Sequence, residues 1–401
     1  MRVLSTCLPG HGHFNPMVAV ARALADAGHE VAFATAEAFC PRVEAAGFTA
    51  FPAGMSLPDQ LAEARRRFPA EDGLPGRERF ESFVPRMLAG VAAPSRVAAL
   101  VSAVERWHPD LLVHDETEFA GAIAATRAGI PYADQSVGIL RPLTMTRLAG
   151  EVVRPLAEEW GVDVGPFGGM FRYLYLDVCP PGLQSPEIGS IEVAHPVKNV
   201  AIAAAPGETL PEWMSELPAV PTVYVSLGTI FNQDLGVFEV ILEGLRDQEL
   251  NVIVTLGSDN DPGALGPQPP NVHVERFIPQ ALLLPYCDVV VNQGGTAILP
   301  ILAYGLPLLV LPQGANQFHN ADALVAAGVA RRLLPGEVTP EAVGADVRRL
   351  LDDPAHRRSG QRLAAEIEAM PGPEEGVRLL EQLARERRPL PRPAPSGSPG
   401  P

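Results

Sequence analysis

The chain has 401 residues, 47% of them hydrophobic and 19% charged, and its formal net charge at pH 7 is −16. This length suits two domains of roughly 200 residues, each with enough apolar material for a core. The negative charge repels nucleic acid and acidic membranes, so a phosphate-bearing ligand would need a local binding device.

The lack of a recognisable signal peptide or membrane span and the scattered cysteines predict a cytoplasmic protein. Only about eight residues precede the first turn with Gly and Pro, too few for the apolar region of a signal peptide. No uncharged apolar run reaches the roughly 18 residues of a membrane span, which argues against stable membrane insertion. The four cysteines are scattered and form no CxxC pair, as expected of buried thiols in a reducing compartment. We expect a cytoplasmic chain without a nucleic-acid partner, and the sequence leaves a homodimer open.

Strands and helices alternate through the first half of the chain. The apolar run 2–8 predicts a buried strand, and Asn15 and Pro16 predict the start of a helix that ends at Gly28. Further strands are expected at 30–35, 48–54, 110–115 and 130–135, with helices at 36–47, near 95–106 and after 115. Residues 56–94 and 136–180 break this rhythm. We interpret them as insertions that line a pocket, although loose surface helices would show the same pattern.

The alternation restarts after the Pro-rich stretch 205–221. Strands are expected at 222–229, 251–257, 271–277, 288–295 and 306–314. Short loops between alternating strands and helices predict α/β domains with doubly wound parallel sheets, hence two Rossmann-like domains facing across a cleft. The expected boundaries are an N-terminal domain at 1–204, a linker at 205–221, a C-terminal domain at 222–370, a helix at 371–387 that returns to the N-terminal domain, and a disordered tail at 388–401.

Two histidines follow the first strand, and a carboxylate ends a later one. Parallel strands deliver their carboxyl ends to one edge of a sheet, where ligands bind in doubly wound folds, so His13 and Asp115 can converge. Three interpretations remain at this point: a metal clip formed by His11, His13 and His114, a catalytic base, and a buried structural pair.

Six stretches of the sequence together resemble one known family. They are GHGHFNPMVAVARALADAGHEVAFAT, PDLLVHDETEFAGAIAATRAGIP, LDVCPPGLQ, VYVSLGT, VERFIPQALLLPYCDVVVNQGG and GLPLLVLPQGANQFHNADALVAAGVA. In this order, and across nearly the whole chain, they resemble the nucleotide-sugar-dependent glycosyltransferases of the GT-B fold. The likeness is greatest to actinobacterial enzymes that glycosylate antibiotics and other secondary metabolites.

The resemblance implies that His13 is the general base for an acceptor hydroxyl and that Asp115 orients and charge-balances it. The acceptor oxygen would displace the nucleoside diphosphate in line and invert the anomeric carbon. Enzymes of this fold neutralise the leaving group without a divalent ion, so no metal site is expected. His11 is then a loop residue, and His114, on the opposite face of its strand from Asp115, is structural.

The resemblance also places the nucleotide-sugar cosubstrate on the second domain. Backbone amides and a helix start after the strand at 288–291 would face the diphosphate. An amide pair would read the sugar, and Phe277 would lie against the base, although core packing explains Phe277 equally well. The implied donor-site residues are Ser226, Gly228, Thr229, Phe277, Ile278, Gln280, Asn292, Gln293, Gly294, Gly295, Thr296, Asn316 and Gln317.

The implied donor site departs from the family's pattern. The usual diphosphate-loop histidine falls on Asn292 or on Gln293, depending on the alignment. The residues TA stand where the family has a glycine followed by a threonine. Asn316 replaces the usual acidic residue, and Phe277 a common tryptophan. Losing one charge-assisted contact costs about 1.5–3 kcal/mol. The alternative is therefore a catalytically silent homologue that serves as the helper subunit of a partner enzyme.

A third reading is a GT-B epimerase or glycoside-releasing enzyme. Such an enzyme would use a carboxylate pair, for which Glu116 and Glu118 are the candidates. A charged helix start, favoured by the helix dipole, explains the same two residues.

The residues also suggest the substrates. Pro300 stands where relatives that use ribonucleotides often have a glutamate for the ribose hydroxyls, and an apolar contact tolerates a deoxyribose. Together with Asn316 and Gln317, this favours dTDP-activated deoxysugars over UDP-glucose. Apolar side chains in the two insertions favour a polyketide, aromatic or macrocyclic acceptor. These are Phe68, Phe80, Phe83, Met87, Met145, Trp160, Phe167, Met170 and Phe171.

Overall fold

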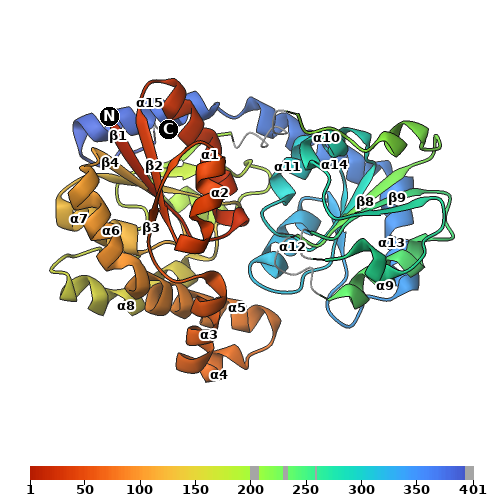
Figure 1. Cartoon of the computed structure of the whole chain (residues 1–401), viewed down its shortest axis with the longest axis horizontal. Coiled ribbons are helices and arrows are strands. Elements are labelled where there is room, and N and C mark those ends of the chain that lie inside the picture. Colours follow the sequence, from red (N-terminus) through yellow and green to blue (C-terminus); the bar gives the residue numbers. More distant parts are fainter. Residues whose placement is uncertain (199–206, 229–233, 258–259, 393–401) are drawn as a thin grey trace, which may run out of the picture. The chain divides into compact units, whose positions relative to one another are not determined.

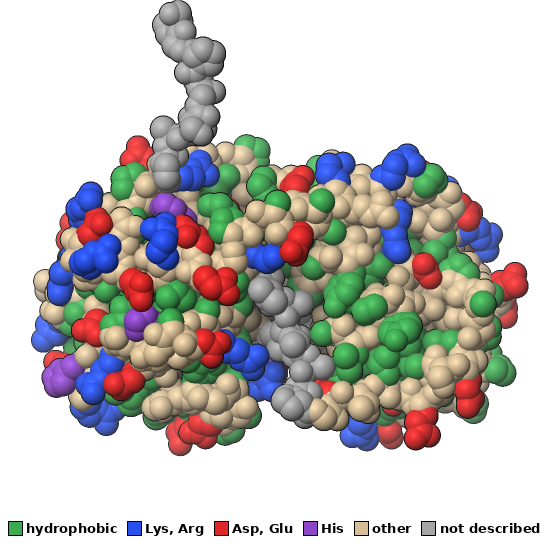
Figure 2. Space-filling model, turned by 90° about the horizontal axis from the view of Figure 1, so that it is seen from above, with side chains coloured by type: hydrophobic (Ala, Val, Ile, Leu, Met, Phe, Trp, Pro, Cys, Tyr) green, Lys and Arg blue, Asp and Glu red, His purple; other side chains and the backbone are tan. Residues whose placement is uncertain are grey.

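The computed structural model describes residues 1–198, 207–228, 234–257 and 260–392, and the chain divides into two compact units. Unit 1 comprises Met1–Cys179, Gln184–Asn199 and Met370–Pro401, and unit 2 comprises Pro180–Leu183 and Val200–Ala369. In each unit, helices lie on both sides of a sheet (Figure 1). Acidic and basic side chains are interspersed on the face shown in Figure 2.

Unit 1 is built on a parallel sheet. Within the described residues this sheet has seven strands in the order β3-β2-β1-β4-β5-β6-β7. The strands are β1 Arg2–Thr6, β2 Glu30–Thr35, β3 Thr49–Pro52, β4 Leu111–Asp115, β5 Tyr132–Gln135, β6 Tyr175–Asp177 and β7 Ala194–Pro196. Its helices are α1 His11–Asp26, α2 Cys40–Ala45, α3 Leu57–Arg67, α4 Pro69–Asp72, α5 Gly76–Met87, α6 Ala93–Trp107, α7 Ala120–Ala128, α8 Leu143–Glu159 and α15 Pro373–Glu386.

Both faces of this sheet are covered, which is why its strands read as continuous apolar runs. Val3 and Leu4 are neighbours on β1 and both are fully buried. Val3 lies in the cluster that holds Phe14 of α1, whereas Leu4 lies in the cluster that holds Leu100 of α6. Successive residues of the strand therefore pack into two separate cores, one on each side of the sheet.

Unit 2 repeats the plan. Within the described residues its parallel sheet has six strands in the order β10-β9-β8-β11-β12-β13. These are β8 Thr222–Ser226, β9 Asn251–Thr255, β10 Val272–Glu275, β11 Val289–Asn292, β12 Leu308–Val310 and β13 Ala330–Arg332. The helices are α9 Leu235–Leu245, α10 Gln280–Leu283, α11 Ile298–Ala303, α12 Gln317–Ala326, α13 Pro340–Asp352 and α14 Pro354–Ala369. Two parallel doubly wound α/β sheets are thus present, as the alternating pattern predicts.

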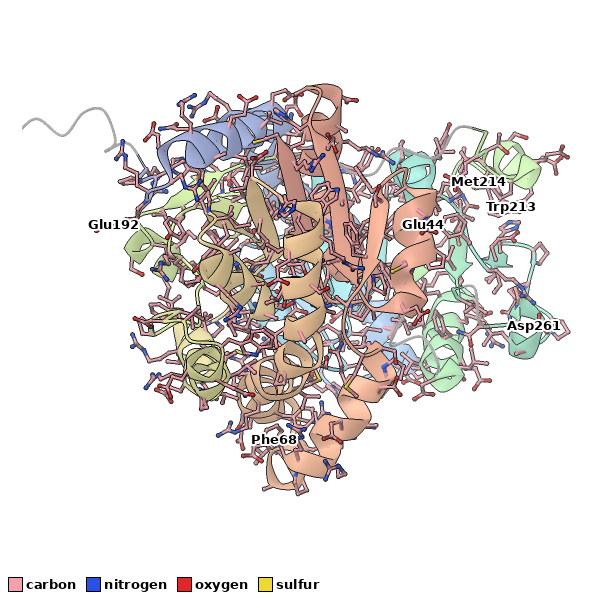
Figure 3. The ribbon with its side chains drawn as sticks, turned by 60° about the vertical axis from the view of Figure 1, so that its left-hand side comes forward. Glu44, Phe68, Glu192, Trp213, Met214 and Asp261 are labelled. Atoms are coloured by element: carbon pink, nitrogen blue, oxygen red, sulfur yellow. The ribbon has the colours of Figure 1, made fainter. Side chains whose placement is uncertain are left out.

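The segment before β8 is attached to the edge of this second sheet. Trp213 lies in a short 3-10 helix, Glu212–Glu216, and is labelled in Figure 3. Its indole stacks on His273 of β10 at 3.9 Å between ring centroids, and its Nε1 donates to Glu275 at 3.1 Å. The described part of the Pro-rich stretch, from residue 207, is accordingly part of unit 2.

The C-terminal helix α15 packs in unit 1 against α1. Gly376 allows this approach, because a Cβ there would lie 3.2 Å from Val20. After the helix, Leu390 is buried, its amide donates to the Tyr173 carbonyl, and its own carbonyl lies 2.9 Å from His195 Nε2. The tail that the sequence predicts to be disordered from residue 388 is therefore ordered through Arg392, because backbone hydrogen bonds and one buried leucine fix it. The remainder, 393–401, lies outside the described residues.

One continuous helical segment within the described residues, Gly76–Trp107, is long and apolar enough to cross a membrane by length and composition alone. It joins α5 to α6 through a π-helical turn, Leu88–Ala92. In this fold 67% of its apolar window is buried inside unit 1. The segment is a core helix, and its apolar character is accounted for by packing.

Candidate active site

The predicted base and carboxylate lie beside the point where the strand order of unit 1 reverses. β1 lies between β2 and β4 in the sheet, so the carboxyl ends of β1 and β4 flank the position where ligands bind in doubly wound folds. His13 follows β1, and Asp115 is the last residue of β4. The two side chains meet there, with His13 Nδ1 3.5 Å from Asp115 Oδ1.

The carboxylate is held rigidly below the surface. Asp115 is fully buried; its Oδ2 accepts the Leu8 amide at 2.9 Å, and its Oδ1 accepts the Thr117 amide at 2.7 Å. Burial by itself raises the pKa of Asp115, but the neighbouring His13 and the hydrogen bonds from Thr117 and Leu8 lower the pKa below its ordinary value. Asp115 therefore stays ionised and can balance a positive charge on His13, which remains partly exposed at 29%.

Thr117 was missed by the sequence analysis. Its hydroxyl donates to Asp115 Oδ1 and lies 3.1 Å from His13 Nδ1, closer to that nitrogen than the carboxylate itself. It stands 104 positions from His13 in the chain, and a threonine in a DETE stretch carries no signal for such a contact.

The helix that carries the histidines begins earlier than predicted. Gly10 is extended, with φ −163°, and its carbonyl accepts the amides of His13 and Phe14, so α1 starts at His11 and Pro16 lies inside it. His11 is consequently a helical residue rather than a loop residue. Its ring packs edge-on against Phe39 at 5.5 Å, and burial followed by the charge of Arg42 lowers its pKa.

His114 lies on the opposite face of β4 from Asp115, as strand alternation predicts. It is fully buried, and its Nε2 lies 3.0 Å from Asp134 Oδ1. Burial lowers the pKa of His114, but the neighbouring Asp134 carboxylate outweighs it and the net shift is upward. Among the described residues no three His, Cys, Asp or Glu side chains gather as metal ligands. The clip of His11, His13 and His114 does not form.

The carboxylates on either side of Thr117 have other partners. Glu118 lies 3.5 Å from Arg96 and accepts the amides of Ala120 and Gly121 at 2.8 and 2.9 Å, so its carboxylate satisfies the first two free amides of α7. Glu116 is buried and accepts the Tyr175 hydroxyl at 2.7 Å. Burial raises the pKa of Glu116. Both carboxylates are engaged in hydrogen bonds within the fold, and they do not form the carboxylate pair that an epimerase or glycoside-releasing enzyme would use.

In unit 2 the predicted donor residues collect at the carboxyl edge of the sheet. Ser226 and Asn292 are register partners at the ends of β8 and β11, beside the reversal of strand order. Asn292 is buried, and its Oδ1 accepts the Gly294 amide at 2.9 Å, so this side chain braces the loop after β11. Thr229 lies outside the described residues.

Gln293 is the neutral amide that reaches towards the β8 loop. Gly228 has φ +76°, and a Cβ at this position would collide with the Gln293 side-chain amide. Gly295 lies on the other side of the same amide, its would-be Cβ 3.2 Å from Nε2. Two glycines thus leave room for one glutamine, which bridges the loops after β8 and β11.

The remaining predicted donor residues differ in their burial and in their hydrogen bonds. Gln317 is buried, and its Oε1 accepts the amides of Gln313 and Gly314 at 2.8 and 3.0 Å, so it braces the loop before α12. Asn316, half-buried, precedes the helix without a side-chain cap. Phe277, two residues after the end of β10, is 65% exposed, which excludes core packing. Ile278 is buried, whereas Gln280, Gly295 and Thr296 are half-buried and Gly294 is buried.

Most of the apolar residues of the two insertions pack into the core of unit 1. Phe80, Phe83, Met87, Met145 and Met170 are buried. The other four, Phe68, Trp160, Phe167 and Phe171, are partly buried against the same core; Phe68 is labelled in Figure 3. The prediction that the insertions line a pocket is therefore wrong for the five buried residues, because α5, α6 and α8 need a core of their own.

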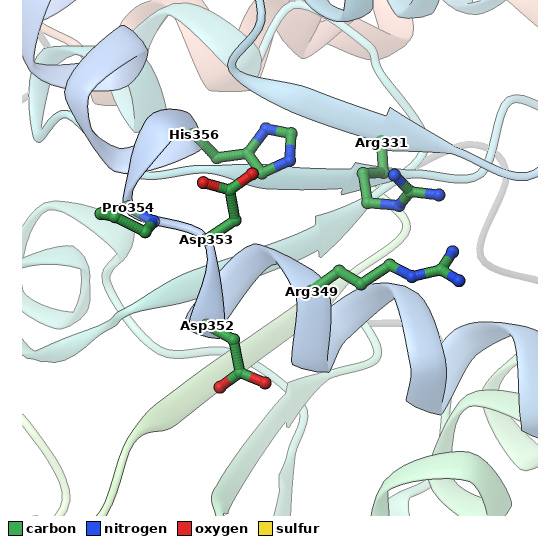
Figure 4. A pocket seen from close by; sticks show the side chains of 6 residues that line it. All are labelled: Arg331, Arg349, Asp352, Asp353, Pro354 and His356. Atoms are coloured by element: carbon green, nitrogen blue, oxygen red, sulfur yellow. The ribbon is translucent and has the colours of Figure 1, made fainter.

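One described pocket lies away from the predicted site residues and is not a candidate for the chemistry. It has a volume of about 440 Å3 and is lined by Arg331, Arg349, Asp352, Asp353, Pro354 and His356 (Figure 4). His356 Nδ1 lies 3.0 Å from the carbonyl of Gly328, which precedes β13. The pocket therefore opens at the amino edge of the sheet, opposite Ser226 and Asn292. Arg331 and Arg349 are also already paired with Asp346.

Comparison with known proteins identifies the family of the chain. The model of the erythromycin biosynthesis protein CIII-like N-terminal domain matches residues 22–228, and the model of the C-terminal domain matches residues 239–383. L-demethylnoviosyl transferase of Streptomyces niveus is 34% identical over 97% of this chain and 99% of its own. Demethyllactenocin mycarosyltransferase of Streptomyces fradiae is 30% identical over 94% of this chain and 85% of its own.

A solved structure extends the likeness to the fold. The glycosyltransferase SnogD from Streptomyces nogalater superposes with a TM-score of 0.74 at 28% identity, covering 96% of this chain and 99% of its own. Two parallel α/β units with polar residues at their carboxyl edges, together with these relatives, define a glycosyltransferase of the GT-B fold. The chain belongs to the erythromycin biosynthesis protein CIII-like family, glycosyltransferases of antibiotic biosynthesis.

Proposed function

We propose that this enzyme transfers a sugar from a nucleoside diphosphate to a hydroxyl of an apolar natural-product aglycone, with inversion at the anomeric carbon. The observation that carries the proposal is the buried, ionised Asp115 beside the partly exposed His13 at the carboxyl edge of the sheet. A helper subunit has no need of a base whose carboxylate partner is held by three hydrogen bonds.

In this mechanism the proton of the acceptor hydroxyl passes to His13 Nε2 while the acceptor oxygen bonds to the anomeric carbon. The bond from that carbon to the β-phosphate oxygen breaks, and the nucleoside diphosphate leaves with the electron pair. A single in-line displacement inverts the centre. Asp115 stabilises the imidazolium that forms. The attraction between the carboxylate and the imidazolium is strong because the carboxylate is buried, where water screens it little.

The donor is proposed to bind at the carboxyl edge of unit 2. Gln293 and the amides of the loop after β11 are the groups proposed to hold the diphosphate, without a metal ion, and the exposed ring of Phe277 is available to stack on a base. Pro300 lies half-buried on α11, while its neighbours Leu299 and Ile301 are in the core. An apolar surface beside the sugar ring of the nucleoside favours dTDP over UDP.

The acceptor class rests on the relatives. Those reported above are named as transferases of noviosyl and mycarosyl sugars, and we infer an antibiotic-type aglycone for this chain as well.

The test is His13→Ala assayed with a nucleotide-sugar panel and an alcohol acceptor, read out by mass spectrometry. We expect kcat to fall by about 10²–10⁴, the usual contribution of a general base, with nucleotide binding retained. His11→Ala is the matched control, because it removes a histidine that lies in the same helical turn as His13 and packs edge-on against Phe39. Turnover of His13→Ala at the parental rate would refute the proposal.

A further inference from the structure

The hydroxyl of Thr117 lies between the two groups of the proposed dyad. It is 3.1 Å from His13 Nδ1, whereas the nearest Asp115 oxygen is 3.5 Å from that nitrogen. The same hydroxyl donates to Asp115 Oδ1. The histidine and the carboxylate are therefore bridged by a threonine.

The direction of these hydrogen bonds follows from the protonation of Asp115. An ionised carboxylate only accepts, so the single hydroxyl proton of Thr117 is committed to Asp115 Oδ1. The Thr117 oxygen can then only accept from His13 Nδ1, which must carry a hydrogen. In neutral imidazole the other nitrogen, Nε2, is left with its lone pair free.

The hydroxyl cannot easily turn away from this position. Thr117 is buried, and its own amide donates to the Asp115 oxygen that accepts its hydroxyl, at 2.7 Å. The residues on both sides are tied: Glu116 accepts from Tyr175, and Glu118 accepts from two amides of α7. A β-branched side chain on a fixed backbone has few rotamers to choose from.

We propose that Thr117 is a positioning residue that sets the tautomer of His13, holding the proton on Nδ1 so that Nε2 can act as the base. The inference rests on the proposed role of His13 and goes beyond it, since it assigns to Thr117 a part that Asp115 cannot fill directly at 3.5 Å. Asp115 contributes the negative charge that stabilises the imidazolium, and Thr117 contributes the hydrogen bond that fixes which ring nitrogen of His13 carries the proton.

The test uses Thr117→Val, which keeps the shape and removes the hydroxyl, and Thr117→Ser, which restores it. Thr6→Val is the matched control: Thr6 is also fully buried, and its hydroxyl has no hydrogen-bond partner among the described residues. The tautomer of His13 is read from the ¹⁵N shifts of histidine-labelled protein above pH 8, with the resonance assigned by its loss in His13→Ala.

We expect Nδ1–H alone in the parent, in Thr117→Ser and in Thr6→Val, and a mixture of tautomers in Thr117→Val. In the assay, kcat of Thr117→Val should fall roughly tenfold with KM little changed, and Thr117→Ser should recover most of it. An unchanged tautomer in folded Thr117→Val, or a parental tautomer already on Nε2, would overturn the inference. Because the ¹⁵N measurement needs no turnover, its failure is distinct from full activity of His13→Ala, which would refute the proposed function instead.

Discussion

The substitution Asp115→Asn tests how the site is held together. The residue is fully buried and its two oxygens accept three donors: the Leu8 amide on Oδ2, and the amide and hydroxyl of Thr117 on Oδ1. Asparagine has the same shape but only one acceptor oxygen. Whichever way its amide turns, an NH2 group faces a backbone N–H that previously had an acceptor, and the charge is lost.

The structure sets the size of the effect. One buried donor left without an acceptor costs about 1–3 kcal/mol, and the remaining bonds weaken from charge-assisted to neutral. We expect unit 1 of Asp115→Asn to be destabilised by about 2–4 kcal/mol at pH 7. In the same variant kcat should fall, though less than in His13→Ala, because the base itself remains.

The pH dependence has a definite sign. The pKa of Asp115 is lowered in the folded state, so its stabilising contribution is fully present above the ordinary aspartate pKa of about 3.9 and is lost as the pH falls towards the folded value. The stability difference between parent and Asp115→Asn should therefore be constant from pH 7 to about pH 5 and should shrink below about pH 4.

The assay is native-state hydrogen exchange, because two units need not unfold as one. The Leu8 amide reports the lost acceptor directly, and the β1 and β4 amides report unit 1. Asp26→Asn, an exposed change on α1, is the control and should shift stability by less than about 0.5 kcal/mol. Parental protection of the Leu8 amide in Asp115→Asn would refute the reasoning.

Three further predictions concern the donor side. Gly228→Ala combines a left-handed backbone, φ +76°, with a collision against Gln293, and it should weaken nucleoside diphosphate binding in calorimetry. The control Gly129→Ala, φ +66° with open space around it, should lower the stability of unit 1 by about 1–2 kcal/mol through backbone strain and leave nucleotide affinity unchanged. Equal nucleotide affinity in the two variants would contradict the role given to Gln293. Chelator should leave transfer activity unchanged, and activity that disappears with chelator and returns with Mg²⁺ or Mn²⁺ would exclude a metal-free diphosphate site. In competitive calorimetry dTDP should bind more tightly than UDP by about 5–150-fold, corresponding to an unpaired hydroxyl at about 1–3 kcal/mol, and UDP binding as tightly as dTDP would remove the argument from Pro300.

The fold could be predicted because its signal is local. Parallel strands buried on both faces appear as short apolar runs, and helices between them appear as longer periodic segments, so alternation alone indicates two doubly wound sheets. The same reasoning placed His13 and Asp115 at one sheet edge, because strand direction in a parallel sheet leaves no other choice.

Tertiary contacts decided what no local pattern encodes. The burial of the apolar insertion residues depends on α5, α6 and α8 packing together. Thr117 meets His13 across 104 positions, and Gly228 makes room for Gln293 across the ends of two strands. Each is a contact between residues far apart in sequence, where the side-chain type fits many environments and only the folded chain selects one.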